Sequence, residues 1–279
     1  MISVLNSVSS LNAQNALAST QSSLQNTLQQ LSTGLRINSG ADDAAGLSIA
    51  NGLGANIAAL TQSTQNASNG IGLLQTADGA LSQVTSLLNR AVTLATEAAT
   101  GGLTTGTGSQ SAALQTEFQS IMDEIDQIGA ATNFNGNTVF TDQTVYTSDG
   151  TTSVANATTT TTIAALTANS SATSLLGATA QDISTVAGAQ TALAAVSAAI
   201  GSVSATRGSI GASINRLTAD VNVENTEVTN LTSAQNSIQN ADMGKTVSKM
   251  TQYNVLQQTG MAALSQANQA QQSVLKLLQ

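Results

Sequence analysis

Apolar residues recur at alternating steps of three and four along most of the 279 residues. From Leu53 to Ala95 they form two neighbouring stripes, which are typical of a helix packed in a bundle rather than in a two-stranded coil. A single stripe continues from Val186 to Ile238 and predicts a helix of over fifty residues. Its strongly polar positions can fix the register between helices, and these are Arg207, Glu224 and Gln235.

The region between these two segments has a different pattern. Leu114 to Ile128 predicts a shorter helix. Asn135-Gly136 and Asp149-Gly150 are dipeptides that favour hairpin turns, with β-prone residues at Val139-Phe140 and Val145-Tyr146. We therefore expect a short β-hairpin region at about 133–180, with an exposed tip in a low-complexity tract rich in Ser and Thr.

Both ends of the chain carry thin apolar stripes on helices rich in Gln, Asn and Ser. Such helices are marginal alone and should become ordered only against a partner. We expect the two terminal helices to pair through a seam that contains Leu17, Leu24, Leu28, Leu31, Met261, Leu264, Leu275 and Leu278. The predicted fold is mainly α: a long antiparallel helical-bundle or coiled-coil rod with a small β-hairpin region and paired terminal helices.

Residues 31–50 form the predicted connector between the first two helices. One helix should end near Gly34 and the next should start near Gly40. Ser39 followed by Asp42 resembles an acidic capping box, which would place Asp42 and Asp43 in the first helical turn. An ordinary solvated turn is the alternative interpretation. The residues that define this connector are Gly34, Arg36, Asn38, Asp42, Asp43 and Gly46.

Composition narrows the functional classes. The chain has no Cys or His, which removes the usual zinc ligands and the commonest general base, and we expect no catalytic residues, metal or cofactor. A net charge of −8 argues against nucleic acid as a partner. Only 8% of residues are charged, against about 25% in ordinary domains, which suggests contact with other copies of the chain. We also expect no membrane span and no cleaved secretory signal.

The sequence of the connector, LSTGLRINSGADDAAGL at 31–47, is very similar to the N-terminal signature of bacterial flagellins. The C-terminal part resembles the same family at Arg207 to Gly211, Asn215 to Leu217, Ala241 to Met243, Val255 to Gln258 and Gln266 to Gln269. Thr132 to Gly136 also looks like the family. The resemblance covers residues 1 to about 140 and about 185 to 279, and it identifies a short form that consists of the filament core domains.

This resemblance implies a structural subunit that assembles into the extracellular flagellar filament for swimming motility. It divides the chain into an inner-domain segment at 1–39, a rod-like helical domain at 40–240 and a second inner-domain segment at 241–279. The implied partners are further copies of the chain, the flagellin export chaperone, the flagellar type III export apparatus, and the hook-associated and cap proteins. A hook–filament junction protein is the first alternative, and a secreted hydrolase on a helical scaffold is the second.

Arg90, Leu94 and Glu117 match residues that, in flagellins, lie in the surface recognised by the vertebrate Toll-like flagellin receptor. Arg90 and Leu94 are one helical turn apart, and both could share a face with Glu117 of the next helix. A surface ion pair of little energetic weight is the alternative. The resemblance implies that the same surface also serves contacts between subunits. Val92 and Thr93 stand where recognised members usually carry Arg and Glu.

Overall fold

The computed structural model describes residues 8–100, 109–147, 158–161 and 181–277. Contacts between Cα atoms divide the chain into two compact units. The terminal unit combines Met1–Ala55 with Thr229–Gln279, and the central unit is Asn56–Val228. These boundaries lie inside two long helices, α2 (Ala44–Ala98) and α4 (Val186–Gln239).

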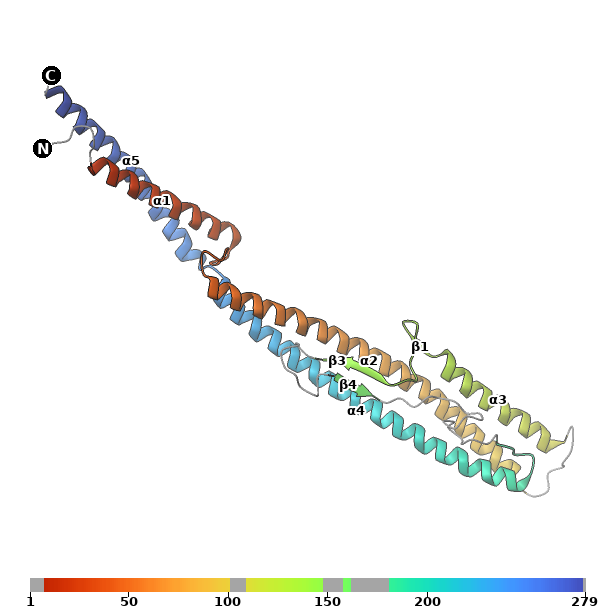
Figure 1. The fold of residues 1–279 in the computed structure, drawn as a ribbon. Helices are drawn as coiled ribbons and strands as arrows, with labels where there is room; N and C mark the ends of the chain where they lie inside the picture. The colour runs from red at the N-terminus through yellow and green to blue at the C-terminus, as the bar shows by residue number, and fades with distance from the viewer. Residues whose placement is uncertain (1–7, 101–108, 148–157, 162–180, 278–279) are drawn as a thin grey trace. The chain divides into compact units, whose positions relative to one another are not determined.

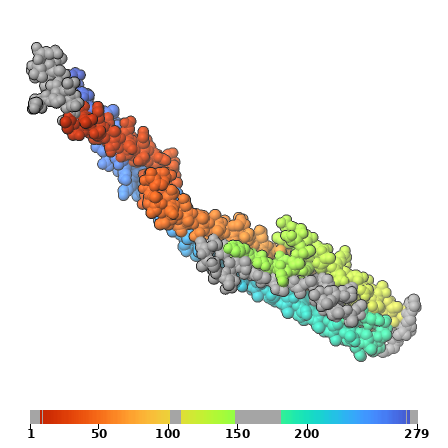
Figure 2. Space-filling model, viewed as in Figure 1, coloured from red at the N-terminus to blue at the C-terminus, as the bar shows by residue number. Residues whose placement is uncertain are grey.

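In the terminal unit, α1 (Val8–Thr33) lies beside α5 (Met243–Leu277), as Figure 1 shows. The two helices are antiparallel, because Ser10 donates a hydrogen bond to Asn268 while Leu35, beyond the other end of α1, pairs with Asn240. In the space-filling view of Figure 2 the atoms of α1 lie directly against those of α5. The predicted pairing of the two terminal helices is therefore confirmed.

The central unit is built around α2, α4 and the shorter α3 (Gln110–Ala131). The two predicted stripes of α2 are confirmed, because side chains from both stripes are buried in one hydrophobic cluster with Phe118 and Ile125 of α3. The α4 stripe joins the same cluster through Val196, Val203 and Ile210. Ser109 caps α3 by accepting a hydrogen bond from the Ala112 amide.

Two polar contacts show that α2 and α4 run antiparallel in the central unit. Ser63 of α2 contacts Glu224 of α4, and Asp78, farther along α2, contacts Arg207, which comes earlier in α4. Two of the three polar residues of the predicted α4 seam, Arg207 and Glu224, therefore bind side chains of α2. Because each contact joins one position on each helix, the pair of contacts defines the register between them.

The β region consists of two small antiparallel pairs. β1 (Asn133–Phe134) pairs with β2 (Asn137–Thr138) through a turn in which Asn135 and Gly136 have φ angles of 52° and 82°. Positive φ at both central residues defines the type I′ turn expected from an Asn-Gly dipeptide. β3 (Gln143–Tyr146) pairs with β4 (Thr158–Thr161).

Parts of the β prediction need correction. Val139 and Phe140 form a bend and are buried in the hydrophobic cluster, because their side chains fill the core instead of extending a strand. Residues 158–161, expected to lie in the exposed low-complexity tip, form a strand along β3. The expected turn at Asp149-Gly150 lies outside the described residues.

By length and hydropathy alone, α4 is apolar enough to cross a membrane, which the sequence analysis did not anticipate. Its N-terminal half is rich in alanine and valine, and side chains such as Ala192, Val196 and Ala199 are buried in the central hydrophobic cluster. The core helix of a soluble protein passes the same test, so this composition is weak support for a membrane span.

Candidate functional site

The ends of four helices meet at the connector of the terminal unit. α1 ends at Thr33, and Gly34 follows it with a φ of 73°, which is accessible to glycine at little cost, and with its amide donating to the Gln30 carbonyl. The next residues run beside the segment between α4 and α5. The Arg36 amide donates to the Gln239 carbonyl at 2.7 Å, and the Ala241 amide donates to the Gly34 carbonyl at 2.9 Å. These bonds join the two connecting segments through their main chains.

Arg36 also contacts the end of α4 through its side chain. Its Nη2 atom donates to the Ile238 carbonyl at 2.6 Å. The last carbonyls of a helix lack partners within the helix and carry partial negative charge, so a guanidinium there is favourable. The Arg36 carbonyl in turn accepts a hydrogen bond from the Gln30 side chain of α1. One residue thus links the end of α1 to the end of α4.

Asp42 organises the loop before α2. Its Oδ2 atom accepts hydrogen bonds from the amides of Asn38 and Ser39, at 3.0 and 2.9 Å, and from the Ser39 hydroxyl. These bonds, the Asn38 amide first, stabilise the carboxylate and lower the pKa of Asp42 below its ordinary value of 3.8. Asn38 adds a side-chain bond to the Leu35 carbonyl. The expected contact from Asp42 back to the Ser39 amide is present.

The helix that follows starts later than expected. α2 begins at Ala44, and its cap is Asp43, whose Oδ1 atom accepts the Gly46 amide at 2.8 Å. The two carboxylates therefore precede the first turn rather than lie within it, because Asp42 closes the loop and Asp43 occupies the capping position. A β-carbon at Gly46 would lie 2.8 Å from the Ile37 side chain and closer still to Asp43, so this position has no room for one.

A matching cap begins α5. Asp242 accepts the Lys245 amide on Oδ1, and its carbonyl accepts both the amide and the hydroxyl of Thr246. Thr246 is consequently buried at the start of the seam between α1 and α5. The sequence analysis missed this cap, although the break at 239–242 and the Asp three residues before Lys245 were the available signals.

The seam between α1 and α5 alternates leucine with small or polar residues. On α1 the covered positions step by four and three through Ala13, Leu17, Thr20, Leu24, Thr27 and Leu31. On α5 they step in the same way through Thr246, Met250, Tyr253, Gln257, Gly260, Leu264 and Ala267. A β-carbon at Gly260 would lie 3.4 Å from the Leu17 side chain, so the helices approach closely there. This seam is heptad-spaced but poor in large apolar side chains.

Two residues expected in this seam lie elsewhere. The side chains of Leu28 and Met261 are 45% and 50% exposed. Leu28 lies on a face of α1 that α5 does not cover, and Met261 is one position past Gly260, which faces α1. Leu17, Leu24, Leu31 and Leu264 are half-buried in the seam. The side chains of Leu275 and Leu278 lie outside the described part of the chain.

The third candidate site lies in the central unit. Arg90 of α2 donates from Nε and Nη2 to Oε1 of Glu117 on α3, at 2.9 and 2.6 Å. Both side chains are about half exposed. Leu94, by contrast, is only 1% exposed, because α3 packs over this face of α2 and Leu94 joins the hydrophobic cluster. The expected three-residue surface is therefore corrected to an Arg90–Glu117 pair above a buried leucine.

The side chains at these sites make capping, packing and ion-pair contacts with other parts of the chain. Within the described residues no group of three or more acidic side chains is placed to hold a metal ion. The described connector carboxylates Asp42, Asp43 and Asp242 each accept main-chain amides: Asp42 closes the loop before α2, and Asp43 and Asp242 cap α2 and α5.

Two family profiles cover most of the chain. "Bacterial flagellin N-terminal helical region" matches residues 4–145, and "Bacterial flagellin C-terminal helical region" matches residues 193–278. Over 142 residues, 50% of this chain, the sequence is 45% identical to a flagellin of Escherichia coli (strain K12) and 43% identical to the phase 1 flagellin of Salmonella naestved. Each alignment spans 28% of the relative's length. The crystal structure of Bacillus cereus flagellin matches at 29% identity with a TM-score of 0.47, covering 57% of this chain and 88% of that chain.

Proposed function

Because this chain belongs to the bacterial flagellin family, we propose that it is the structural subunit of a flagellar filament, which forms when copies of the chain assemble. Flagellins are structural proteins and not enzymes. In this role the chain acts outside the cell and contributes to swimming motility. The pairing of α1 with α5 would form the inner part of the filament, and the central unit would form the rest of each subunit.

The observation that carries this proposal is the apolar surface left on the paired terminal helices. Large apolar side chains remain about half exposed or more at Val8, Leu11, Leu28, Met243, Val247, Val255, Leu256 and Met261. Burying one such side chain completely stabilises an interface by roughly 1.5–3 kcal/mol. Contiguous exposed apolar surface marks interaction sites in soluble proteins. Further copies of the same helix pair are the natural cover for it.

Polymerisation of the purified full-length chain tests the proposal. Seeded wild-type protein should form filaments visible by electron microscopy. The double variant Leu28→Ser with Met261→Ser should stay monomeric yet keep its helical circular dichroism, because both residues lie outside the α1–α5 seam. The matched control, Leu28→Met with Met261→Leu, keeps both side chains apolar and should assemble. Normal filaments from the serine variant would remove the support for the proposal.

Export before assembly requires the same surface to be covered. We infer that α5 binds the flagellin export chaperone before the chain passes through the flagellar type III export apparatus, since Val247, Val255 and Met261 are exposed. Hook-associated and cap proteins would then contact the two ends of the filament. A pull-down of the chaperone with full-length protein, and its loss on deletion of residues 240–279, tests the chaperone interaction. Equal capture of both forms would contradict it.

The Arg90–Glu117 pair supports a narrower proposal. Both side chains are exposed and bonded to each other on the surface of α2 and α3, which suits recognition by the Toll-like flagellin receptor or contact with a neighbouring subunit. Receptor activation by monomeric protein should fall on Arg90→Ala with unchanged circular dichroism. The connector residues Gly34, Arg36, Asn38, Asp42, Asp43 and Gly46 would hold the terminal helices in the geometry that assembly needs.

A further inference from the structure

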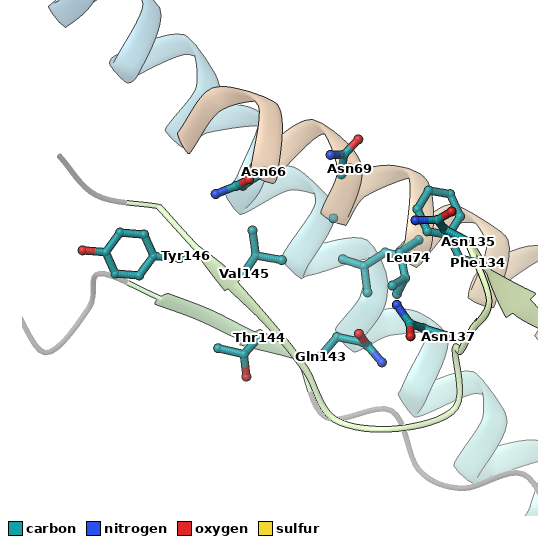
Figure 3. A pocket seen from close by; sticks show the side chains of 12 residues that line it. Asn66, Asn69, Leu74, Phe134, Asn135, Asn137, Gln143, Thr144, Val145 and Tyr146 are labelled. Atoms are coloured by element: carbon teal, nitrogen blue, oxygen red, sulfur yellow. The ribbon is translucent and has the colours of Figure 1, made fainter. Parts of the chain in front are cut away.

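A groove of about 690 Å³ lies in the central unit, between α2 and the β region (Figure 3). One side is formed by α2, and the other by the β1–β2 hairpin and by β3. Gly70 allows this arrangement, because a β-carbon there would lie 2.6 Å from the Val145 side chain. The volume is within the range that holds small ligands in proteins. None of the sites described above uses this groove.

The polar lining of the groove consists mostly of side-chain amides. Asn66 and Asn69 come from α2, Asn135 and Asn137 from the hairpin, and Gln143 from β3. Each amide offers two donors and one acceptor oxygen. Within the described residues, the side chains of Asn69, Asn135 and Asn137 form no hydrogen bond to another protein group. Unengaged amides on both sides are therefore available to a ligand.

Apart from Thr144, the remaining described lining is apolar or aromatic, and none of it carries a charge. Leu73 and Leu74 of α2 and Val145 of β3 contribute aliphatic surface, and Phe134 and Tyr146 contribute rings. Tyr146 is 49% exposed, so its ring is accessible from solvent. Anionic ligands are usually bound by Arg or Lys, and none of the described residues that line the groove has a basic side chain. The groove thus favours a neutral ligand with both polar groups and apolar faces.

We propose that this groove binds a neutral saccharide that carries N-acetyl groups, such as a short oligomer of N-acetylglucosamine. Hydroxyl and acetamido groups both donate and accept hydrogen bonds, which matches the lining amides. The methyl of an acetamido group fits the aliphatic surface of Leu74 and Val145, and the apolar face of a sugar ring can lie against Phe134 or Tyr146. This activity would be additional to filament formation.

The arrangement of the amides favours a saccharide over an extended peptide. A peptide added to a strand edge bonds mainly through main-chain groups along one line. Here the lining amides come from α2 on one side and from the hairpin and β3 on the other. A ligand with hydroxyl groups around its whole perimeter can contact both sides at once.

Titration calorimetry of the full-length monomer with N,N′,N″-triacetylchitotriose tests the proposal, with maltotriose as a neutral sugar lacking N-acetyl groups. Wild-type protein should bind triacetylchitotriose, and maltotriose should bind more weakly. Asn69→Asp and Asn137→Asp each replace two donors with acceptors on one side of the groove and should weaken binding about tenfold or more. The control Asn89→Asp changes an exposed asparagine of α2 outside the groove and should bind as wild type.

Several outcomes would overturn the proposal. These are no heat of binding at millimolar triacetylchitotriose, equal affinity in the Asn69→Asp and Asn89→Asp variants, or binding of an unrelated extended peptide instead of the sugar. Circular dichroism checks that each variant is folded, which is expected because Asn69, Asn89 and Asn137 are exposed. The titration uses monomers, so an absence of sugar binding would not bear on the proposal that the chain assembles into filaments. In the same way, a chain that does not polymerise can still be titrated with the sugar.

Discussion

Glu224 of α4 is buried, and its carboxylate accepts a hydrogen bond from the hydroxyl of Ser63 on α2 at 2.5 Å. The other carboxylate oxygen accepts the Thr64 hydroxyl at 3.0 Å. Glu224 is only 6% exposed and lies on a stripe that is otherwise mostly apolar. A buried carboxylate is tolerated only when its oxygens are hydrogen-bonded. The two hydroxyls of α2 therefore make this position of α4 possible.

Replacing Glu224 should show how much this contact contributes. Glu224→Ala removes the acceptor of the Ser63 hydroxyl and leaves a cavity in the buried interface. We therefore expect the free energy of unfolding to fall by about 1–3 kcal/mol. Glu224→Leu fills the space with apolar atoms and should cost less, since buried polar groups can often be replaced by hydrophobic ones. Urea unfolding followed by circular dichroism measures both variants. A larger loss for leucine than for alanine would contradict the packing of this site.

The lowered pKa of Asp42 predicts how the connector responds to acid. A carboxyl group whose folded-state pKa is depressed adds stability that is complete well above its ordinary value of 3.8 and is lost as the pH falls through the folded-state pKa. Asp42→Ala should therefore be less stable than wild type at neutral pH, and the difference should shrink below pH 3.8. Unfolding curves at several pH values measure this. Asp142→Ala controls for the removal of one exposed carboxylate.

Two glycines of the connector should respond differently to alanine. Gly34 has a φ of 73°, and an L-residue in this conformation costs roughly 1–2 kcal/mol, so Gly34→Ala should destabilise the terminal unit. Gly40 has open space around it and no positive φ, so Gly40→Ala should be neutral or stabilise by about 0.4–1 kcal/mol. Thermal unfolding of both variants measures the contrast. Equal effects would show that the conformation of Gly34 is not what limits the substitution.

The burial of Leu94 predicts that substitutions near Arg90 separate into two kinds. Leu94→Ala removes core packing and should lower the free energy of unfolding by about 2–5 kcal/mol. Arg90→Ala removes an exposed ion pair and should change it by less than about 1 kcal/mol. Urea unfolding distinguishes the two. If receptor binding is expressed per folded molecule, the Leu94→Ala variant should bind as wild type does. The Arg90→Ala variant should still bind more weakly than wild type.

Long-range periodicity made most of the fold predictable. The stripe from Val186 to Ile238 corresponds closely to α4, which spans Val186–Gln239. A repeat sustained over fifty residues averages out the local preferences of single residues, so only one face of the helix can be buried. The polar positions Arg207 and Glu224 were also informative, because a polar residue on an apolar stripe needs a partner on the facing helix.

Local capping and the choice between two faces were less predictable. Ser39 and Asp43 are both good caps, and the sequence alone does not reveal that the contact between Asp42 and the Ser39 amide closes a loop while Asp43 caps the helix. Leu24 and Leu28 are one helical turn apart on α1, and only the position of α5 decides that Leu24 is covered while Leu28 is exposed. The threonine run has strong β propensity, but its pairing with β3 is a tertiary contact that no local pattern specifies.

The Glu224 contact has a mechanical consequence for the central unit. A heptad repeat alone would let α4 slide along α2 under tension and settle again one repeat away, roughly 10 Å at 1.5 Å per residue. Such a slide would move Glu224 from Ser63 and Thr64 to a position facing Asn56 and Ile57, or Gly70 and Ile71. Neither position offers the two hydroxyls that hold the carboxylate now, so the shifted states are less favourable than the observed register. The two helices should therefore transmit a pull along their axes as one stiff element.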